Sequence, residues 1–171
     1  MDIILNRRSV RKFDLNKMVS HEDLIDLIKH GESAGTARRQ KSREYIIIEN
    51  EDFINKLSEI YVKSSMLVKE CNQMSAVIGK TNEDLPCVQF VPTDCALATQ
   101  NIMDYAVSKG IGSVMLGTYP DKERLSKASE LLNLDKNKFV FTFICLGYPI
   151  DKENAFYDMN KFDESVISYI K

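Results

Sequence analysis

A basic segment near the start of the chain carries the residues best suited to bind an anion. It reads Asn6-Arg7-Arg8-Ser9-Val10-Arg11-Lys12-Phe13, with four basic side chains and one hydroxyl between positions 7 and 12. Arginine binds phosphate through two parallel hydrogen bonds, and a serine hydroxyl with free backbone N–H groups completes such a site. A solvated basic stretch and a nucleic-acid patch are the two other interpretations of this pattern.

The overall charge favours a small phosphorylated ligand over a nucleic acid. The chain has 171 residues, with 23 basic and 25 acidic side chains and a net charge of −2. A protein that binds a nucleic-acid backbone usually carries a net basic face, whereas a small ligand needs only a few cations. A second basic stretch, from Arg38 to Arg43, keeps a nucleic-acid module open as a less favoured alternative.

Glycine-rich phosphate loops do not explain phosphate binding here. Gly110-Ile111-Gly112 begins the G-x-G-x-x-G pattern, but Met115 stands at the third glycine position and the segment leads from a helix into a strand. The P-loop pattern is also absent from the sequence. The arginines and the serine are therefore the expected phosphate ligands.

The composition is typical of one globular domain over residues 1–171, with 44% hydrophobic and 28% charged residues. No apolar run approaches the roughly 18 residues that span a membrane, and the N-terminus lacks the charge order of a signal peptide. We therefore expect a cytoplasmic protein that contacts no membrane. The cysteines form no C-x-x-C pair, so we expect no metal site and free, mostly buried thiols, with a reactive thiol as the alternative. They are Cys71, Cys87, Cys95 and Cys145.

Hydrophobic spacing predicts alternating helices and strands. The expected helices are 21–33, 52–70, 93–109 and 121–133, and the expected strands are 45–48, 113–116 and 139–146. We expect the strand at 45–48 to be covered on both faces and the helix at 93–109 to lie in the centre, because both are continuously apolar. Residues 71–92 are predicted to be mostly irregular, with at most a short strand at 88–91. These elements fit an α/β or an α+β sheet covered by helices.

The last stretch of the chain, residues 151–171, has too little apolar content to form a core of its own. We expect this C-terminal extension to pack across another surface, in the same subunit or in a neighbour.

Five stretches, in order, resemble the nitroreductase-like FMN-dependent oxidoreductases. The resemblance implies an α+β three-layer sandwich, with a mixed, mainly antiparallel sheet flanked by helices. It also implies a homodimer that holds FMN at each end of the subunit interface. The matching stretches are Arg7–Phe13, Asp94–Met103, Gly110–Gly112 with Gly117, Leu146–Pro149 and Lys161–Ser165.

The resemblance also implies roles for individual residues. Arg7, Arg8 and Ser9 would hold the phosphate and ribityl end of FMN, and Lys161 would add a cation from the C-terminal segment. Arg11 would lie near the flavin N1 and O2 edge, where a fixed positive charge stabilises the anionic reduced flavin. The backbone at Leu116 and Gly117 would lie beside N5, where hydride arrives.

The loop between the first helix and the first strand departs from the family pattern. Relatives read Pro-Ser-Ala-x-Asn-x-Gln there, followed by an aromatic residue, and this loop reaches the flavin of the partner subunit. Thr36 keeps the hydroxyl, but Arg39 replaces the asparagine, Lys41 the glutamine and Arg43 the tryptophan. Because arginine only donates hydrogen bonds, an acceptor for the flavin N3–H is lost, while contact with phosphate or an acidic substrate is gained. A basic solvated loop is the alternative.

The function that the resemblance implies is an FMN-dependent NAD(P)H oxidoreductase. NAD(P)H would reduce the flavin at N5 and leave, and a quinone, a nitroaromatic or an enone-like acceptor would then take the electrons. The flavin carries the chemistry, so no catalytic side chain is assigned. Residues 84–93 are short for a substrate-covering segment, which weakens the expectation of the usual substrate pocket. A flavin-binding carrier or sensor without efficient turnover is therefore the alternative.

Overall fold

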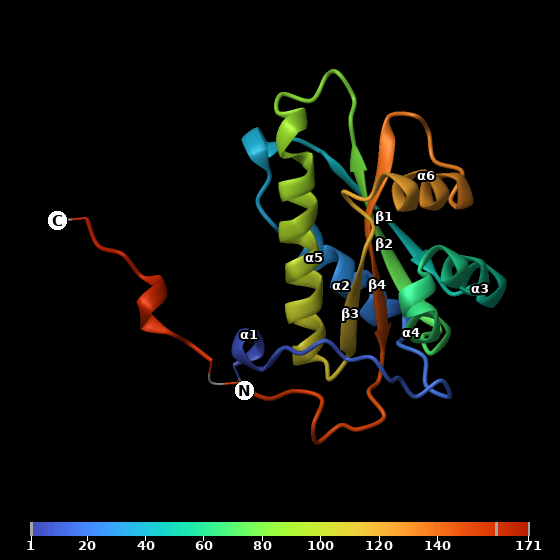
Figure 1. Cartoon of the computed structure of the whole chain (residues 1–171), viewed down its shortest axis with the longest axis vertical. Coiled ribbons are helices and arrows are strands. Elements are labelled where there is room, and N and C mark those ends of the chain that lie inside the picture. Colours follow the sequence, from blue (N-terminus) through green and yellow to red (C-terminus); the bar gives the residue numbers. More distant parts are fainter. Residues whose placement is uncertain (1, 160, 171) are drawn as a thin grey trace.

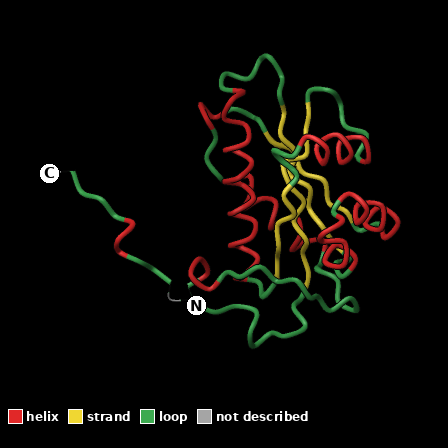
Figure 2. Tube along the Cα trace, viewed as in Figure 1, coloured by secondary structure: helices red, strands yellow, loops and turns green. Residues whose placement is uncertain are grey.

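Four strands form one sheet in the order β1-β2-β4-β3, and each neighbouring pair is antiparallel. The computed structural model describes residues 2–159 and 161–170. β2 and β4 form the middle of the sheet, and β1 and β3 form its edges (Figures 1 and 2). The strands are β1 (Arg43–Ile48), β2 (Gln73–Lys80), β3 (Gly112–Gly117) and β4 (Lys138–Gly147).

Helices cover both faces of this sheet (Figure 1). α2 (His21–Glu32) and α5 (Val91–Ser108) lie on one face, and the short α1 (Ile3–Asn6) packs beside α5. α3 (Glu51–Ile60), α4 (Ser65–Lys69) and α6 (Lys122–Leu131) lie on the other face. The predicted α+β sandwich of three layers is thus confirmed, and a parallel bridge between Ser9 and Ser113 gives the sheet its mixed character.

The helices begin where polar side chains satisfy the free N–H groups of their first turns. The Ser20 hydroxyl accepts from the Asp23 N–H at the start of α2, and Asn50 accepts from the Phe53 N–H at the start of α3. Asp121 does the same for α6. These caps explain why the predicted helix starts agree closely with the observed ones.

The apolar core has two parts, one on each face of the sheet, because successive residues of a strand point to opposite faces. In β2, Met74, Ala76 and Ile78 pack toward α3, α4 and α6. Val77 points to the other face and packs with residues of α2 and α5, including Leu27 and Ile102. Apolar side chains therefore cover both faces of the central strands.

The prediction for residues 71–92 is wrong. β2 occupies Gln73–Lys80 and pairs with both β1 and β4, and residues Val88–Phe90 form a 3₁₀ turn rather than a strand. Buried polar residues in β2 hide the strand pattern in the sequence. Gln73, which is fully buried, accepts from the Val19 N–H (2.6 Å) and donates to the Val19 carbonyl (2.9 Å) and to Glu49 (2.7 Å).

Three further expectations need correction. The helix expected at 52–70 is interrupted at Tyr61, whose backbone has φ −103° and ψ 57°. The strand at 45–48 is covered on both faces only in part: Ile46 packs against one core and Ile47 against the other, and both are half-buried in this edge strand. The helix at 93–109 does not lie in the centre, because α5 covers one face of the sheet and leaves Leu97 exposed.

The extended N-terminal segment lies against the start of β3, and this close approach requires a glycine. The Val10 N–H donates to the Ser113 carbonyl (3.0 Å), and a Cβ at Gly112 would come within 2.7 Å of Val10 Cγ1. Val10 is β-branched and cannot move aside easily. We expect Gly112→Ala to lower the free energy of unfolding by about 1–3 kcal/mol in urea titrations. An unchanged midpoint would contradict this packing.

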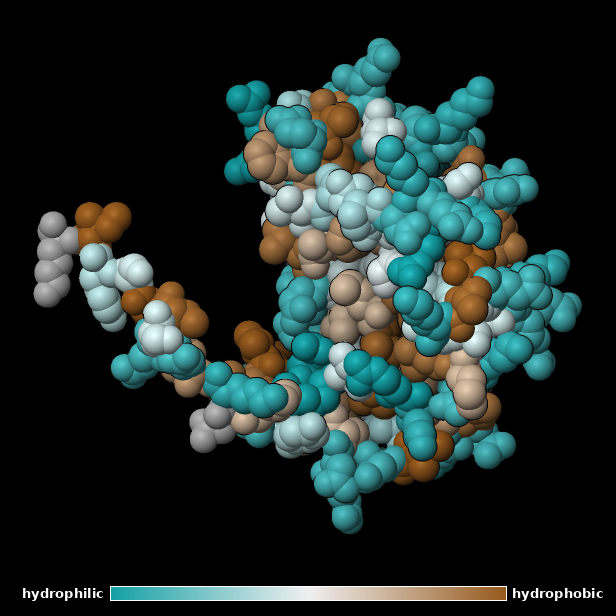
Figure 3. Space-filling model, in the orientation of Figure 1, coloured by the Kyte–Doolittle hydropathy of each residue, from teal (hydrophilic) through white to brown (hydrophobic). Residues whose placement is uncertain are grey.

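The C-terminal segment leaves the body of the molecule (Figure 3). Residues 161–170 extend away from the sheet and helices and are exposed throughout. Its surface carries several large apolar side chains, and those of Phe162, Val166, Tyr169 and Ile170 are each more than 70% exposed. In the part of the chain that the structure describes, no helix is long and apolar enough to cross a membrane.

Candidate functional site

The N-terminal segment sorts its side chains onto two sides, as an extended backbone must. Arg7, Ser9 and Arg11 line a groove of about 360 Å³ between this segment, α5 and β3. Its remaining walls are mostly apolar side chains of α5 and the sheet. They are Ala96, Thr99, Gln100, Met103, Val114, Met115 and Phe141.

The polar end of this groove has donors left over for a ligand. Arg7 Nε lies 3.8 Å from Asp104, and Arg11 Nη1 donates to the Ser9 carbonyl (3.2 Å). Neither guanidinium is used up by these contacts, since each offers five N–H donors. Among the described residues the Ser9 hydroxyl has no hydrogen-bond partner. Two guanidinium groups and a hydroxyl therefore line an otherwise mostly apolar groove.

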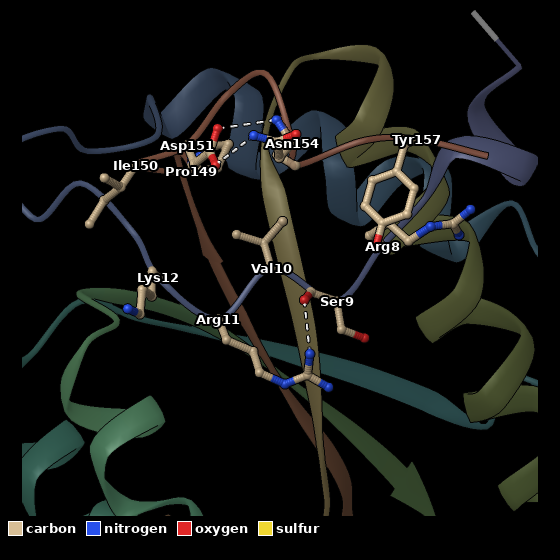
Figure 4. A pocket seen from close by; sticks show the side chains of 11 residues that line it. Arg8, Ser9, Val10, Arg11, Lys12, Pro149, Ile150, Asp151, Asn154 and Tyr157 are labelled. Atoms are coloured by element: carbon tan, nitrogen blue, oxygen red, sulfur yellow. Dashed lines mark hydrogen bonds between the residues drawn. The ribbon is translucent and has the colours of Figure 1, made fainter. Parts of the chain in front are cut away.

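Arg8 and Lys12 line a second pocket, of about 470 Å³, which Ser9 and Arg11 also line (Figure 4). Arg8 Nη2 donates to the Leu5 carbonyl (2.6 Å), Nη1 to the Arg7 carbonyl, and the guanidinium stacks over the Tyr157 ring at 4.9 Å. These contacts fix the N-terminal segment and the first part of the C-terminal segment. The structure thus places Ser9 and Arg11 in two adjoining pockets, one with Arg7 and the other with Arg8.

β3 ends beside this groove. Gly117 pairs with Thr142, the neighbour of the groove residue Phe141, so the last residue of β3 lies next to that wall. A Cβ at Gly117 would meet nothing within 4 Å, whereas the Leu116 side chain is buried in the core. The backbone at Gly117 is therefore open to a ligand.

Neighbouring side chains hold the end of β3 in place. Arg124 Nη1 donates to the Gly117 carbonyl (3.0 Å) and stacks over the Tyr61 ring at 5.3 Å. The Tyr61 hydroxyl is hydrogen-bonded to the buried Thr118 hydroxyl, at 2.5 Å. Burial raises the pKa of Tyr61 to about 12, so its hydroxyl stays protonated at neutral pH. Tyr61 and Arg124 were not predicted from the sequence, because only the fold brings α3 and α6 to this strand end.

Thr36 and Arg39 lie beside the N-terminal end of α5, at a tight turn of residues 36–43. The Ala37 N–H donates to Asp94 Oδ1 (2.9 Å), and the side chains of Gln40 and Ser42 donate to Oδ2 (2.7 and 2.6 Å). Arg7, by contrast, lies next to Asp104. These two places are about 15 Å apart along the helix axis. One chain therefore does not bring Thr36 and Arg39 to the Arg7 end of the groove.

The buried Asp94 organises this turn, a role that the sequence analysis missed. Its side chain is 2% exposed, and its own backbone carbonyl accepts from Arg43 Nη1 (3.1 Å). In the sequence, Asp94 is indistinguishable from the acidic residues that commonly occupy the first turn of a helix. Its hydrogen-bond partners could not be predicted, because they lie more than fifty positions away in the chain.

Neither Lys161 nor a cysteine is among the residues that line the groove. Lys161 is exposed on the C-terminal segment, and the described residues offer it no ion pair or hydrogen bond. All four thiols are free, and those of Cys71, Cys95 and Cys145 are buried, as expected. Burial raises the pKa of the Cys95 thiol to about 12, which keeps it protonated and unreactive.

The residues of the groove fit FMN. The cations and the hydroxyl in its lining suit a phosphate, and the apolar walls suit a flat ring system. The open Cβ position at Gly117 leaves room for such a ring against the backbone. The volume of about 360 Å³ lies within the range of small-molecule and cofactor sites. The donor set thus suits a phosphorylated planar cofactor better than a free metal ion or a nucleic-acid backbone.

Comparisons with known proteins agree with this geometry. The Nitroreductase family model matches residues 76–148. A protein of Archaeoglobus fulgidus, provisionally named an NADH dehydrogenase/NAD(P)H nitroreductase, is 31% identical over 166 residues, which cover 95% of this chain and 92% of the relative.

Solved structures show the same fold. A provisionally named NADH oxidase from Clostridium acetobutylicum has a TM-score of 0.90 and 32% identity, with 99% of each chain covered. A protein from Parabacteroides distasonis, with the same provisional name as the Archaeoglobus protein, has a TM-score of 0.88 and 29% identity, with 98% of this chain and 95% of that chain covered. With a relative this similar over nearly its whole length, the chain belongs to the nitroreductase family.

Proposed function

We propose that this protein is an FMN-dependent NAD(P)H oxidoreductase that passes electrons to a quinone, a nitroaromatic or a related small acceptor in the cytosol. One observation carries the proposal. Arg7, Ser9 and Arg11 line one groove with apolar side chains of α5 and the sheet, and the unobstructed backbone of Gly117 lies next to its wall in β4. That arrangement offers phosphate ligands and a place for a reactive ring.

The residues of this chain would bind and orient the cofactor. Arg7 and Ser9 would hold its phosphate, and Arg11 would place a positive charge next to the ring. FMN, when bound, supplies the hydride-accepting and hydride-donating chemistry. A positive charge already in place stabilises negative charge that develops on the ring, because no protein group must reorganise. Val114, Met115 and Phe141 would exclude water from one side of the groove.

A homodimer would complete this site. We propose that the 36–43 turn of one subunit approaches the ring end of the other subunit's groove, so that Thr36 and Arg39 reach it from outside. We also propose that residues 161–170, with their exposed Phe162, Val166 and Tyr169, pack on the partner and bring Lys161 with them. Burying these apolar side chains would favour association.

Removal of a phosphate ligand tests the Arg7 end of the groove. We expect Arg7→Ala to weaken FMN binding by about 1.5–3 kcal/mol, because a charge-assisted hydrogen bond is lost. Fluorescence titration of the apoprotein with FMN measures the effect. Lys136→Gln, which removes an exposed charge elsewhere, is the control and should leave FMN affinity unchanged. Equal affinities for Arg7→Ala and the wild-type protein would mean that the phosphate lies elsewhere.

The visible absorbance spectrum of the purified protein tests the function itself. We expect flavin bands that bleach when NAD(P)H is added without oxygen and return when a quinone is added. Bands that bleach but do not return with any acceptor would show a flavin that is reduced without turnover. That result would support the carrier or sensor alternative, which the arginines of the 36–43 turn suggest. Absence of bands after incubation with FMN would refute the proposal.

A further inference from the structure

The turn at residues 36–43 contains two consecutive arginines in the left-handed region of backbone conformation. Arg38 has φ 49° and ψ 33°, Arg39 has φ 56°, and the Gln40 N–H donates to the Ala37 carbonyl (3.1 Å). This is the pattern of a type I′ turn, whose central positions favour Asn, Gly and Asp. The other described non-glycine residue with a positive φ is Asn133, a residue type that tolerates it. Arginine at both central positions is unfavourable for the backbone.

Buried groups hold this strained turn on both sides. Before the arginines, the Ala37 N–H donates to the Asp94 carboxylate. After them, Gln40 donates to Asp94, donates to the Cys87 carbonyl (3.1 Å) and accepts from the Cys87 N–H (3.1 Å). The surrounding structure thus imposes the conformation. Backbone strain that the structure maintains in this way is typical of functional sites.

The cations of the turn have no counter-charge. Arg38, Arg39 and Lys41 are exposed, and within the described part of the chain none of them forms an ion pair or a side-chain hydrogen bond. The chain has an excess of acidic residues. Several of its other basic side chains are paired, among them Arg43, whose Nε lies 3.6 Å from Glu32. Three unpaired cations at one turn are therefore available to an external anion.

The position of the turn restricts the source of that anion. The turn lies at the N-terminal end of α5, where Asp94 anchors it. In the proposed function the FMN phosphate lies at the other end, near Arg7 and Asp104. In the proposed dimer the turn approaches the ring end, not the phosphate end, of the partner's groove, so an anion at the turn would come from a substrate rather than from FMN. Arg39 is also poorly suited to the flavin ring, because a guanidinium cannot accept a hydrogen bond.

We propose that Arg38, Arg39 and Lys41 bind the 2′-phosphate of NADPH and so select NADPH over NADH. This inference rests on the proposed function. A phosphate monoester carries nearly two negative charges at neutral pH, and paired arginines bind it in two-point geometry. The pyrophosphate is common to both dinucleotides, so only the 2′-phosphate distinguishes them. The strained turn fixes the backbone that carries the two arginines before the ligand arrives. This reduces the conformational entropy lost on binding.

Calorimetry on the flavin-loaded, oxidised enzyme tests this subsite without turnover. NADP⁺ and NAD⁺ are titrated separately into the wild-type protein and into the Arg38→Gln/Arg39→Gln double variant. We expect the Kd for NADP⁺ to rise roughly tenfold or more and the Kd for NAD⁺ to change less than about twofold. Lys63→Gln/Lys136→Gln removes two exposed charges outside the turn and should change neither value.

Every other result of these titrations would overturn the proposed selectivity for NADPH. An equal rise in both Kd values would place the dinucleotide pyrophosphate, rather than the 2′-phosphate, at the turn and overturn the selectivity. No rise in either value, or no NADP⁺ binding by the wild-type protein, would overturn the proposal altogether. The flavin absorbance of the same samples reports on the proposed function separately, because a protein that cannot be loaded with FMN fails at that earlier step.

A single substitution separates a binding role from a structural one. Arg39→Gly removes one cation and also relieves the left-handed strain, since glycine adopts positive φ freely. We expect the Tm to stay the same or rise by a few degrees while NADP⁺ binding weakens. If the Tm falls, Arg39 supports the fold rather than the ligand, and the proposal is wrong.

Discussion

The Asp94→Asn variant is expected to lose about 2–4 kcal/mol of unfolding free energy, because the buried Asp94 carboxylate accepts hydrogen bonds from several donors. Its two carboxylate oxygens accept from the backbone of Ala37 and from the side chains of Gln40 and Ser42. Asparagine keeps the size but has one acceptor oxygen, and its NH₂ group would face groups that also donate. Buried donors left without a partner each cost free energy.

Urea unfolding followed by circular dichroism measures this loss. Glu123→Gln is a matched carboxylate-to-amide change at an exposed position whose ion pair with Lys127 lies on the surface of α6. We expect that control to change stability by less than about 1 kcal/mol. A loss below about 1 kcal/mol for Asp94→Asn would show that Asp94 does not hold the turn. If the inference about the 2′-phosphate is correct, Asp94→Asn should also weaken NADP⁺ binding, because Arg38 and Arg39 would no longer be fixed.

The Gly117→Val variant is expected to fold normally and to lose FMN. A Cβ at Gly117 meets no protein atom within 4 Å, and the new side chain would enter the space proposed for the ring. We expect FMN affinity to fall by roughly 3 kcal/mol, about a hundredfold, because the rigid strand and the ring cannot both give way. The Tm should stay the same or rise, since glycine weakens a strand.

A graded series sharpens this test. Gly117→Ala should weaken FMN binding less than Gly117→Val, with no loss of Tm in either variant. Gly112→Ala, in the same strand, should show the reverse pattern, because its Cβ meets Val10 rather than the groove. Normal FMN affinity in Gly117→Val would place the ring elsewhere. A lower Tm in Gly117→Val would instead show that the open space is needed by the fold.

Local sequence reasoning predicts part of the groove that contains Arg7, Ser9 and Arg11. Arg7, Ser9 and Arg11 share one groove because alternate residues of an extended segment point the same way, and this alternation can be inferred from the sequence once the segment is known to be extended. Arg8 lines the adjoining pocket, which shares Ser9 and Arg11 with this groove. Its contacts with the Leu5 carbonyl and the Tyr157 ring depend on the fold and could not be predicted from the sequence.

The central strand β2 shows where sequence reasoning fails. Gln73 and Ser75 are polar, and Gly79 interrupts the apolar pattern, so the segment resembles a loop. In the structure Gln73 is satisfied by Val19 and Glu49, and a Cβ at Gly79 would come within 2.5 Å of the Phe139 ring. Polar and small residues are thus part of the core, because distant residues supply their hydrogen bonds and occupy the space of the missing side chain.

The sequence by itself determined the order of most helices and strands, the basic N-terminal segment and the family resemblance. These depend on hydrophobic period, capping residues and short motifs, all of which are local. Only the tertiary structure decided that Asp94 anchors the 36–43 turn, that Arg38 and Arg39 adopt left-handed conformations, and that the Cβ position at Gly117 is open. The physical reason is that each of these features is set by groups far apart in the chain, whose approach depends on packing of the whole sheet and its helices.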